Sequence, residues 1–412
     1  MLDLAAILLV LTAGFSYANH RFLKWPTTIG VMALALALSL GVIGLDACGI
    51  AGPREHERAI LARISFSEVL MEGMLSILLF AGAFHVNLGN LMRLVRPITA
   101  LAIVGTALST LLVGFGCWWL MGVFGVDLPL IYCLLFGALI SPTDPIAVLG
   151  VLRSAQVPAD IEATIAGESL INDGVGVVLF ALLLEMLHSG EPPTTSAGVG
   201  LFAREALGGV ALGTAIGTLI NAVLRSIDDY QVEVLITLAT VVGGYALAQA
   251  LETSGPLAMV TIGLLIGNEG RAYSMSNLTR KNVDLFWQML DEILNSVLFV
   301  LIGLQCTVVD VPAGSLRVIV PVVMLSLAAR FLVAGLPVLL WPTWFSLPKP
   351  AGWLLTWCGL RGGISVALAL ALPPGEQRDC VLMLTYSVVV FSILVQGLSV
   401  GWLARRLGLA GH

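Results

Sequence analysis

Charged residues are scarce in this sequence of 412 residues: aspartate, glutamate, lysine and arginine make up 11% of it, whereas hydrophobic residues make up 58%. Soluble proteins carry roughly 25% charged and 45–50% apolar residues. The composition therefore excludes an ordinary soluble protein and predicts a polytopic membrane protein. The net charge of -6 is spread over loops and a few sites inside apolar segments, so it indicates neither a nucleic-acid partner nor an acidic substrate.

The sequence also lacks the motifs of nucleotide binding, covalent catalysis and resident metals. Its six cysteines show no metal-ligand spacing and fall mostly inside apolar segments, which indicates packing residues. A Walker loop, a Rossmann glycine pattern and a nucleophile elbow are all absent from plausible contexts. The loops are too short for a soluble domain. We therefore predict a protein that is not an enzyme, uses no cofactor, binds no nucleotide and is not a nucleotide-driven pump.

Thirteen apolar segments are long enough to cross a membrane, at about 17 to 25 residues each, with one or two shorter or broken. They lie at residues 3–18, 27–45, 66–86, 97–124, 129–152, 161–187, 198–223, 231–251, 256–268, 284–305, 316–342, 350–372 and 379–404. An odd number of crossings puts the termini on opposite sides of the membrane. Most lysines and arginines of the loops lie on the side of the C-terminus, so the positive-inside rule predicts an outer N-terminus and a cytoplasmic C-terminus in the cell membrane.

A polar octapeptide, GESLINDG at residues 167–174, interrupts the apolar segment 161–187. On a helix, Glu168 stands above Asn172 and Ser169 above Asp173, so the four side chains share an arc of roughly 140° and face one partner or one cavity. An ionised side chain at mid-membrane costs about 2.5 to 3.5 kcal/mol, and such charges usually mark ion or proton pathways. The alternative is a polar cluster that only joins helices, a task usually performed by Ser, Thr, Asn or Gln.

Two other segments contain helix-breaking sequences at corresponding places. Segment 129–152 contains SPTDP at residues 141–145, and segment 350–372 contains GLRGG at residues 359–363. Two prolines cannot both keep the helical hydrogen bonds intact, and the three glycines weaken the second helix. The segments are seven apart and so run in opposite directions, which predicts an inverted repeat with two crossed discontinuous helices. The alternative is that proline and glycine merely bend each helix.

The charges inside the apolar segments do not balance. Asp144, Glu168 and Asp173 are negative, whereas Arg330 and Arg361 are positive. One carboxylate is left uncompensated, and in a medium of low dielectric constant it must take up a proton or a monovalent cation. A site that cannot hold both at once has the property that cation/proton exchange requires.

Four motifs, in order along the chain, resemble those of the monovalent cation:proton antiporter family of the NhaP/NHE type. They are SPTDP at 141–145, GESLINDG at 167–174, DEILNSVLFVLIG at 291–303 and GLRG at 359–362. The resemblance covers nearly the whole chain and implies a homodimer with one transmembrane antiporter domain over residues 1–412. It further implies a core, at approximately 97–187 and 316–404, that moves against the dimerisation helices in an elevator-like alternating access.

The resemblance also implies a cation site. Asp173 would be the essential carboxylate that binds Na⁺ or H⁺. Asp144, Ser169 and the backbone carbonyl of Thr143 would complete the shell around Na⁺.

Further roles follow from the same resemblance. Glu168 would act through water and pair with Arg330, Asn172 would hold the broken helices together, and Arg361 would balance their carbonyl ends. Similar electrogenic antiporters carry Asp at the position of Asn172. The Asn-Asp pair therefore predicts electroneutral, one-for-one exchange.

These observations predict a secondary active antiporter that exchanges Na⁺ or Li⁺ for a proton and serves pH homeostasis. K⁺/H⁺ exchange on the same fold stays open because the sequence does not reveal the size of the cavity, and the physiological direction stays open as well. The predicted partners are monovalent cations, protons and the lipid bilayer. The competing functions are a cation channel with these carboxylates in its pore, a sensor without transport, and an intramembrane enzyme, for which a Ser/His pair, a His cluster and a protease-type Asp pair are missing.

Overall fold

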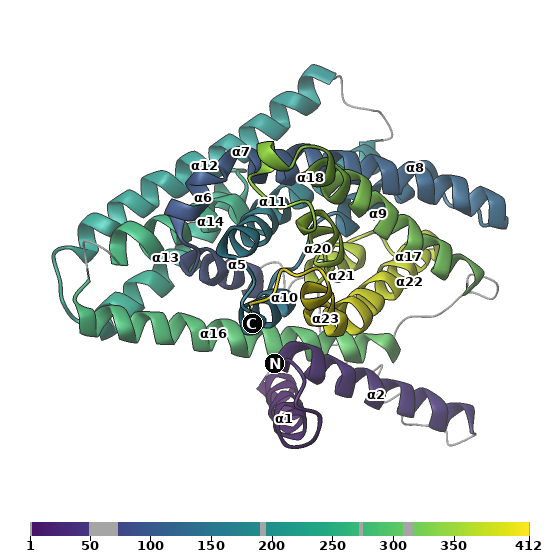
Figure 1. Cartoon of the computed structure of the whole chain (residues 1–412), viewed down its shortest axis with the longest axis horizontal. Coiled ribbons are helices and arrows are strands. Elements are labelled where there is room, and N and C mark those ends of the chain that lie inside the picture. Colours follow the sequence, from purple (N-terminus) through teal and green to yellow (C-terminus); the bar gives the residue numbers. More distant parts are fainter. Residues whose placement is uncertain (1, 49–72, 190–194, 272–274, 308–315, 412) are drawn as a thin grey trace. The chain divides into compact units, whose positions relative to one another are not determined.

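The computed structural model describes residues 2–48, 73–189, 195–271, 275–307 and 316–411 (Figure 1). These residues form helices joined by short connections, and no strand occurs among them. Helices lie in all thirteen predicted segments. Eight helices of the described ranges are long and apolar enough to cross a membrane, and α5 (Leu75–Phe84) and α9 (Leu130–Ile140) are shorter apolar helices. The prediction of an all-α polytopic membrane protein is confirmed, while the number of crossings stays a prediction.

The chain divides into two compact units. The first comprises Met1–Leu70, Leu108–Pro158 and Asn295–His412, and the second comprises Met71–Ala107 and Ala159–Leu294. One long helix, α16 (Asn277–Leu304), contributes to both. The predicted division into core and dimerisation helices stays a prediction.

The second unit contains the helix that carries the polar octapeptide. Besides α5, its elements are α6 (Leu88–Arg93), α7 (Val95–Thr99), the π-helical turn η3 (Ala100–Gly105), α11 (Ala159–Ser189), α12 (Thr195–Leu224), α13 (Tyr230–Ala250), α14 (Gly255–Leu265) and the π-helical turn η4 (Ile266–Gly270).

Glycines bring α14 close to its neighbours in this unit. On α12, Gly209, Gly213 and Gly217 recur every four residues and so form one stripe, which packs against α14. A Cβ added to Gly213 would lie 2.7 Å from the carbonyl oxygen of Ala258. Gly263 of α14 likewise allows a close approach of the backbone of α5, which also packs on α14. Small residues allow the backbones to approach this closely. The resulting van der Waals packing drives helix association in membranes, because burying apolar surface between helices contributes little free energy there.

Polar side chains mark where several helices of the second unit begin. The side chain of Asp229 caps α13 by accepting hydrogen bonds from the backbone amides of Gln231 and Val232. Ser254 accepts from the amide of Leu257 at the start of α14. Ser276 does the same for Thr279, so α16 begins at Asn277, well before the predicted apolar segment. The predicted start was late because this first part of α16 is amphipathic and not uniformly apolar.

The first unit contains both interrupted segments. Its elements are α1 (Leu2–Ala18), the π-helical turn η1 (Asn19–Leu23), α2 (Thr27–Ala47), most of α8 (Thr106–Phe124), α9, α10 (Ile146–Ser154), the 3₁₀ turn η5 (Gln305–Thr307), α17 (Leu316–Arg330), the π-helical turn η6 (Phe331–Gly335), α18 (Leu336–Leu340), α19 (Pro342–Phe345), α20 (Ala351–Trp357), α21 (Gly363–Leu370), α22 (Glu376–Phe391), the π-helical turn η7 (Ser392–Gly397) and α23 (Leu398–Arg406).

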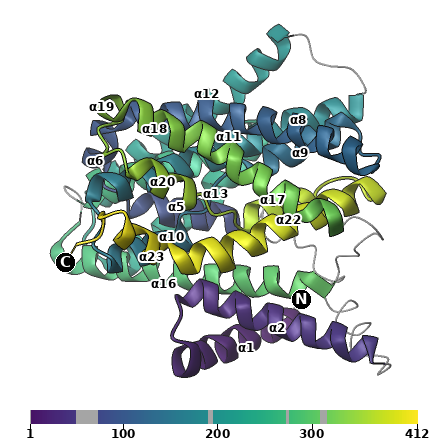
Figure 2. The same cartoon turned by 45° about the vertical axis from the view of Figure 1, so that its right-hand side comes forward.

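Both predicted interruptions are confirmed. Residues 141–145 separate α9 from α10, and residues 358–362 separate α20 from α21. Within the same unit, α21 packs on α9, and α22 packs on α9 and α21. The same helix also packs on α17, beside which it lies in Figure 2. Proline and glycine therefore break these helices and do not only bend them.

Candidate functional site

The polar octapeptide forms the middle of α11, as its helical period predicts. Glu168, Ser169 and Asn172 are each 1% exposed, and Asp173 is 9% exposed. These four side chains are buried although two of them carry carboxyl groups. Burial of that kind is costly unless a proton, a cation or a hydrogen-bond donor compensates it.

The opposite face of α11 packs within its own unit. Gly167 lies against Leu91, Gly174 lies against Leu257 of α14, and Ile171 packs on the apolar cluster that includes Leu91. At 100° per residue, these three positions of α11 lie within an arc of about 60°. The centre of that arc lies about 160° from the centre of the polar arc. The neighbouring helices of the unit thus cover one face of α11, and both carboxyl groups lie on the other.

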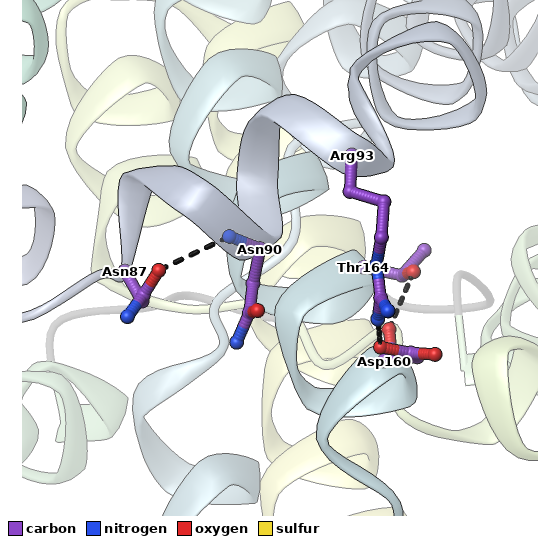
Figure 3. Close-up of polar contacts among 5 residues, drawn as sticks. All are labelled: Asn87, Asn90, Arg93, Asp160 and Thr164. Carbon is purple, nitrogen blue, oxygen red and sulfur yellow. Dashed lines mark hydrogen bonds and ion pairs between the residues drawn. The ribbon is translucent and has the colours of Figure 1, made fainter.

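Polar contacts hold the first turn of α11 in place (Figure 3). Arg93 at the end of α6 forms an ion pair with Asp160, and the Thr164 hydroxyl donates to the Asp160 carbonyl at 2.7 Å. The side chain of Asn87 caps α6 by accepting from the Asn90 amide at 3.0 Å. The exposed ion pair contributes only about 0 to 1 kcal/mol to stability. The negative charge of Asp160 also interacts favourably with the positive, N-terminal end of the α11 dipole. These contacts fix where α11 starts relative to α6.

In the first unit, Arg361 joins the two helix breaks. This side chain is only 2% exposed, and its Nη1 atom donates to the carbonyl oxygens of Ser141 and, at 2.9 Å, of Pro142. These carbonyls lie at the carboxyl end of α9, where the interruption leaves them without partners in the helix. The guanidinium charge therefore lies at the negative end of the α9 dipole.

The backbone also connects the breaks, beside Asp144. The amide of Asp144 donates to the carbonyl oxygen of Leu360 at 2.8 Å. Thr143, the preceding residue, is buried. A Cβ added to Gly362 would overlap the Asp144 carboxylate. Only glycine at that position lets the second break approach this carboxylate so closely.

Arg330 lies beside the second break as well. It ends α17 and is 7% exposed, and a Cβ added to Gly359 would lie 2.6 Å from its Nε atom. Arg330 and Arg361 line one small cavity of about 10 Å³, together with Ser326 and Gln396. That volume is close to the minimum needed for one water molecule. Two buried cationic side chains thus border one cavity next to the break.

Sequence reasoning missed two residues that the structure makes conspicuous. The hydroxyl of Ser392 accepts from the amide of Arg361 at 3.1 Å and lies 3.2 Å from the carbonyl oxygen of the same residue. A lone serine in an apolar segment gave no signal for this role. Glu233 in α13 is fully buried, and no described residue donates a hydrogen bond to either of its carboxylate oxygens. An acidic residue inside a predicted apolar segment was the signal that could have found it.

The predicted site residues thus occur in two sets. The set in the first unit surrounds the two breaks and consists of Thr143, Asp144, Arg330 and Arg361. The set in the second unit shares one face of α11 and consists of Glu168, Ser169, Asn172 and Asp173. A common cation shell drawn from both sets stays a prediction.

Two discontinuous helices joined at their breaks, together with carboxyl groups buried midway along an apolar helix, define the architecture of a secondary active transporter. The sequence profile of the family described as "Sodium/hydrogen exchanger, transmembrane" matches residues 7–406. The chain belongs to this family of transporters, and the predicted resemblance is confirmed.

Individual relatives agree over nearly the full length. The Na⁺/H⁺ antiporter NhaP of Pseudomonas aeruginosa is 50% identical over 413 residues, which cover 99% of this chain and 97% of the relative. The Na⁺/H⁺ antiporter NhaH of Halobacillus dabanensis is 36% identical over 410 residues, covering 98% and 97%. The structure of the sodium proton antiporter MjNhaP1 from Methanocaldococcus jannaschii at pH 8 matches with a TM-score of 0.75 and 20% identity, covering 98% of this chain and 97% of that one. This last likeness shows the fold.

Proposed function

We propose that this protein is a secondary active antiporter that exchanges Na⁺ or Li⁺ for a proton across the membrane. One observation carries the proposal: Glu168 and Asp173 are buried midway along α11, in a polar arc centred about 160° around the helix from Gly167, Ile171 and Gly174. Carboxyl groups in such a position are costly, and in membrane proteins they usually mark ion or proton pathways. The Na⁺/H⁺ antiporter relatives support the same substrates.

Competition for Asp173 is the proposed mechanism of coupling. A buried carboxylate is stable either when a proton neutralises it or when a cation lies beside it, and the two exclude each other. Asp144, Ser169 and the backbone carbonyl of Thr143 would provide the remaining oxygen ligands for Na⁺. The transported cation is a substrate, and it leaves the site whenever a proton replaces it.

The neighbouring residues would set the charge that this carboxylate experiences. Arg361 already lies against two backbone carbonyls, so a large part of its charge offsets the end of the α9 dipole. Glu168 would act through water and pair with Arg330. Asn172 carries no charge, so Asp173 would be the single carboxyl group that changes protonation, and one cation would exchange for one proton without net charge movement.

The assembly and orientation follow from the same proposal. The protein would be a homodimer in the cell membrane, with the N-terminus outside and the C-terminus in the cytoplasm. A core containing the two broken helices would move against the dimerisation helices and expose the site to each side in turn.

The test measures proton movement driven by Na⁺ in liposomes that carry the purified protein, with a pH-sensitive dye inside. Potassium and valinomycin clamp the membrane potential, and Li⁺ and K⁺ replace Na⁺ in parallel runs. We expect a Na⁺ gradient to drive protons in the opposite direction at a rate that does not depend on the potential. Sodium flux without opposite proton movement would instead identify a channel and refute exchange.

A matched pair of substitutions on α11 locates the coupling. Asp173→Asn removes the titratable group at mid-helix, and we expect exchange to be lost while the protein still inserts and assembles. Asp160→Asn makes the same chemical change in the exposed first turn of the same helix, where exchange should persist. Exchange that survives in the Asp173→Asn variant would refute the assignment of this carboxylate.

A further inference from the structure

An apolar groove of about 760 Å³ lies on the first unit between η6, α20 and α23. Its walls include Phe331, Trp353, Trp357, Trp402 and Leu403, and Arg406 lines it where α23 ends. The volume is within the roughly 300–1,000 Å³ typical of small-molecule sites. No part of the groove belongs to the predicted cation site.

Side-chain contacts hold the walls of the groove in position. The rings of Phe331 and Trp353 stack with centroids 4.8 Å apart, which joins η6 to α20. Trp357 donates from Nε1 to the Ser399 hydroxyl at 2.8 Å, which joins α20 to α23. The hydroxyl of Thr356 donates to a backbone carbonyl within α20 at 2.8 Å. Because these polar atoms are already hydrogen-bonded, the interior of the groove offers a surface suited to an acyl chain.

From its tryptophans, we place the groove at the level of the membrane–water interface. Tryptophans are enriched at that level in membrane proteins, and Trp341, Trp344, Trp353 and Trp402 are each at least half exposed on this unit. Trp353 lies in the first turn of α20 and Trp402 near the end of α23, and both line the groove. The end of the groove at Arg406 therefore lies where phospholipid headgroups lie.

The charge at this end is positive. The stretches that form the groove, residues 327–357 and 396–407, contain no aspartate or glutamate, whereas they contain the buried Arg330 together with Lys349, Arg405 and Arg406. The guanidinium of Arg406 lies over the ring of Trp402, 5.1 Å from its centroid. This cation–π contact holds the side chain at the mouth of the groove. A fixed arginine at the end of an apolar groove complements a molecule with an anionic head and an apolar tail.

We propose that this groove binds one membrane phospholipid with an anionic headgroup. Its phosphate contacts Arg406, and one acyl chain lies along the apolar walls between Phe331 and Leu403. Acyl chains are equally apolar in the bilayer and in the groove, so the headgroup sets the selectivity. A basic residue near the surface attracts anionic lipid by about 1 kcal/mol, which corresponds to about a fivefold preference over a zwitterionic lipid.

The lipid would contact the reverse side of the second helix break. Phe331 follows Arg330 directly in the chain, and Trp357 directly precedes the interruption at residues 358–362. An occupied groove would therefore hold α20 and η6 together next to the residues that surround the break. We expect phosphatidylglycerol to raise the thermal midpoint of the protein more than phosphatidylcholine does.

Native mass spectrometry of the purified full chain tests the proposal. The delipidated protein is titrated with phosphatidylglycerol or with phosphatidylcholine of the same acyl chains, and bound lipids are counted. We expect one phosphatidylglycerol site about fivefold tighter than any phosphatidylcholine site. Arg406→Gln should abolish this preference, and Arg406→Lys should keep part of it because the charge stays while the planar contact is lost.

The neighbouring arginine provides a matched control. Arg405 lies on the side of α23 that faces α10, where Gly401 contacts Val151. Arg405→Gln changes the net charge equally and should preserve the preference. Equal losses in the two Gln variants would show diffuse surface attraction and overturn the proposal, as would equal binding of the two lipids by the unaltered protein. A Trp402→Ala variant that changes the oligomeric state would show that a second copy of the chain occupies the groove, which also overturns it.

Discussion

The contact of Arg361 with the end of α9 gives a prediction about the stability of the two helix breaks. Arg361→Ala removes the donor to the Ser141 and Pro142 carbonyls and leaves both without this partner in a buried place. A hydrogen bond to a charged group contributes about 1.5 to 3 kcal/mol. Loss of two such bonds should therefore destabilise the breaks by about 3 to 6 kcal/mol.

Hydrogen–deuterium exchange can measure this change where it occurs. The amide of Asp144 donates across the breaks to Leu360, so its exchange reports their opening. At about 1.4 kcal/mol for each factor of ten, Arg361→Ala should raise the local opening constant by about 10² to 10⁴. Arg361→Lys should show an intermediate effect, because both bonds come from one nitrogen and an ammonium group can still donate twice.

The control is Arg378→Ala in the same unit. Arg378 is partly exposed and lies 3.7 Å from the carboxylate of the adjacent Asp379, a contact worth less than about 1 kcal/mol. We expect this variant to leave exchange at residues 141–146 unchanged. If Arg361→Ala also exchanged there at the rate of the unaltered protein, the guanidinium would not hold the breaks together and the reasoning would be refuted.

Two further substitutions test other contacts. Gly362→Ala places a methyl group on the Asp144 carboxylate, and we expect it to raise the Na⁺ concentration for half-maximal exchange by at least about tenfold, since a displacement of about 1 Å can cost that much. The control is Gly150→Ala, whose methyl group would point into open space and should have no effect. Equal kinetics for the two variants would contradict the contact. Glu233→Gln removes a buried carboxylate to which no described residue donates a hydrogen bond, and it should raise the thermal midpoint, because an unpaired buried charge costs several kcal/mol. Glu252→Gln changes an exposed carboxylate and should leave the thermal midpoint unchanged. A lowered midpoint for Glu233→Gln would show that this carboxylate has a stabilising role.

The sequence by itself determined the features that depend on local order along the chain. Apolar segments of sufficient length placed a helix in each predicted region, because a helix in lipid must satisfy its own backbone hydrogen bonds. The prolines at 142 and 145 and the glycines at 359–363 marked both interruptions for the same reason. The 3.6-residue period placed Glu168 and Asp173 in one polar arc, and the order of the four motifs indicated the family.

Only the tertiary structure decided which parts meet across long separations in the chain. The contact between Arg361 and Ser141 spans 220 residues, and no periodicity within either segment indicates it. The same holds for the glycines of α12 against α14, for the burial of Glu233 and for the groove below Trp402 and Arg406. Local patterns fix which face of a helix is apolar or polar, whereas the identity of the neighbour on that face depends on how the close-packed side chains of distant segments fit together.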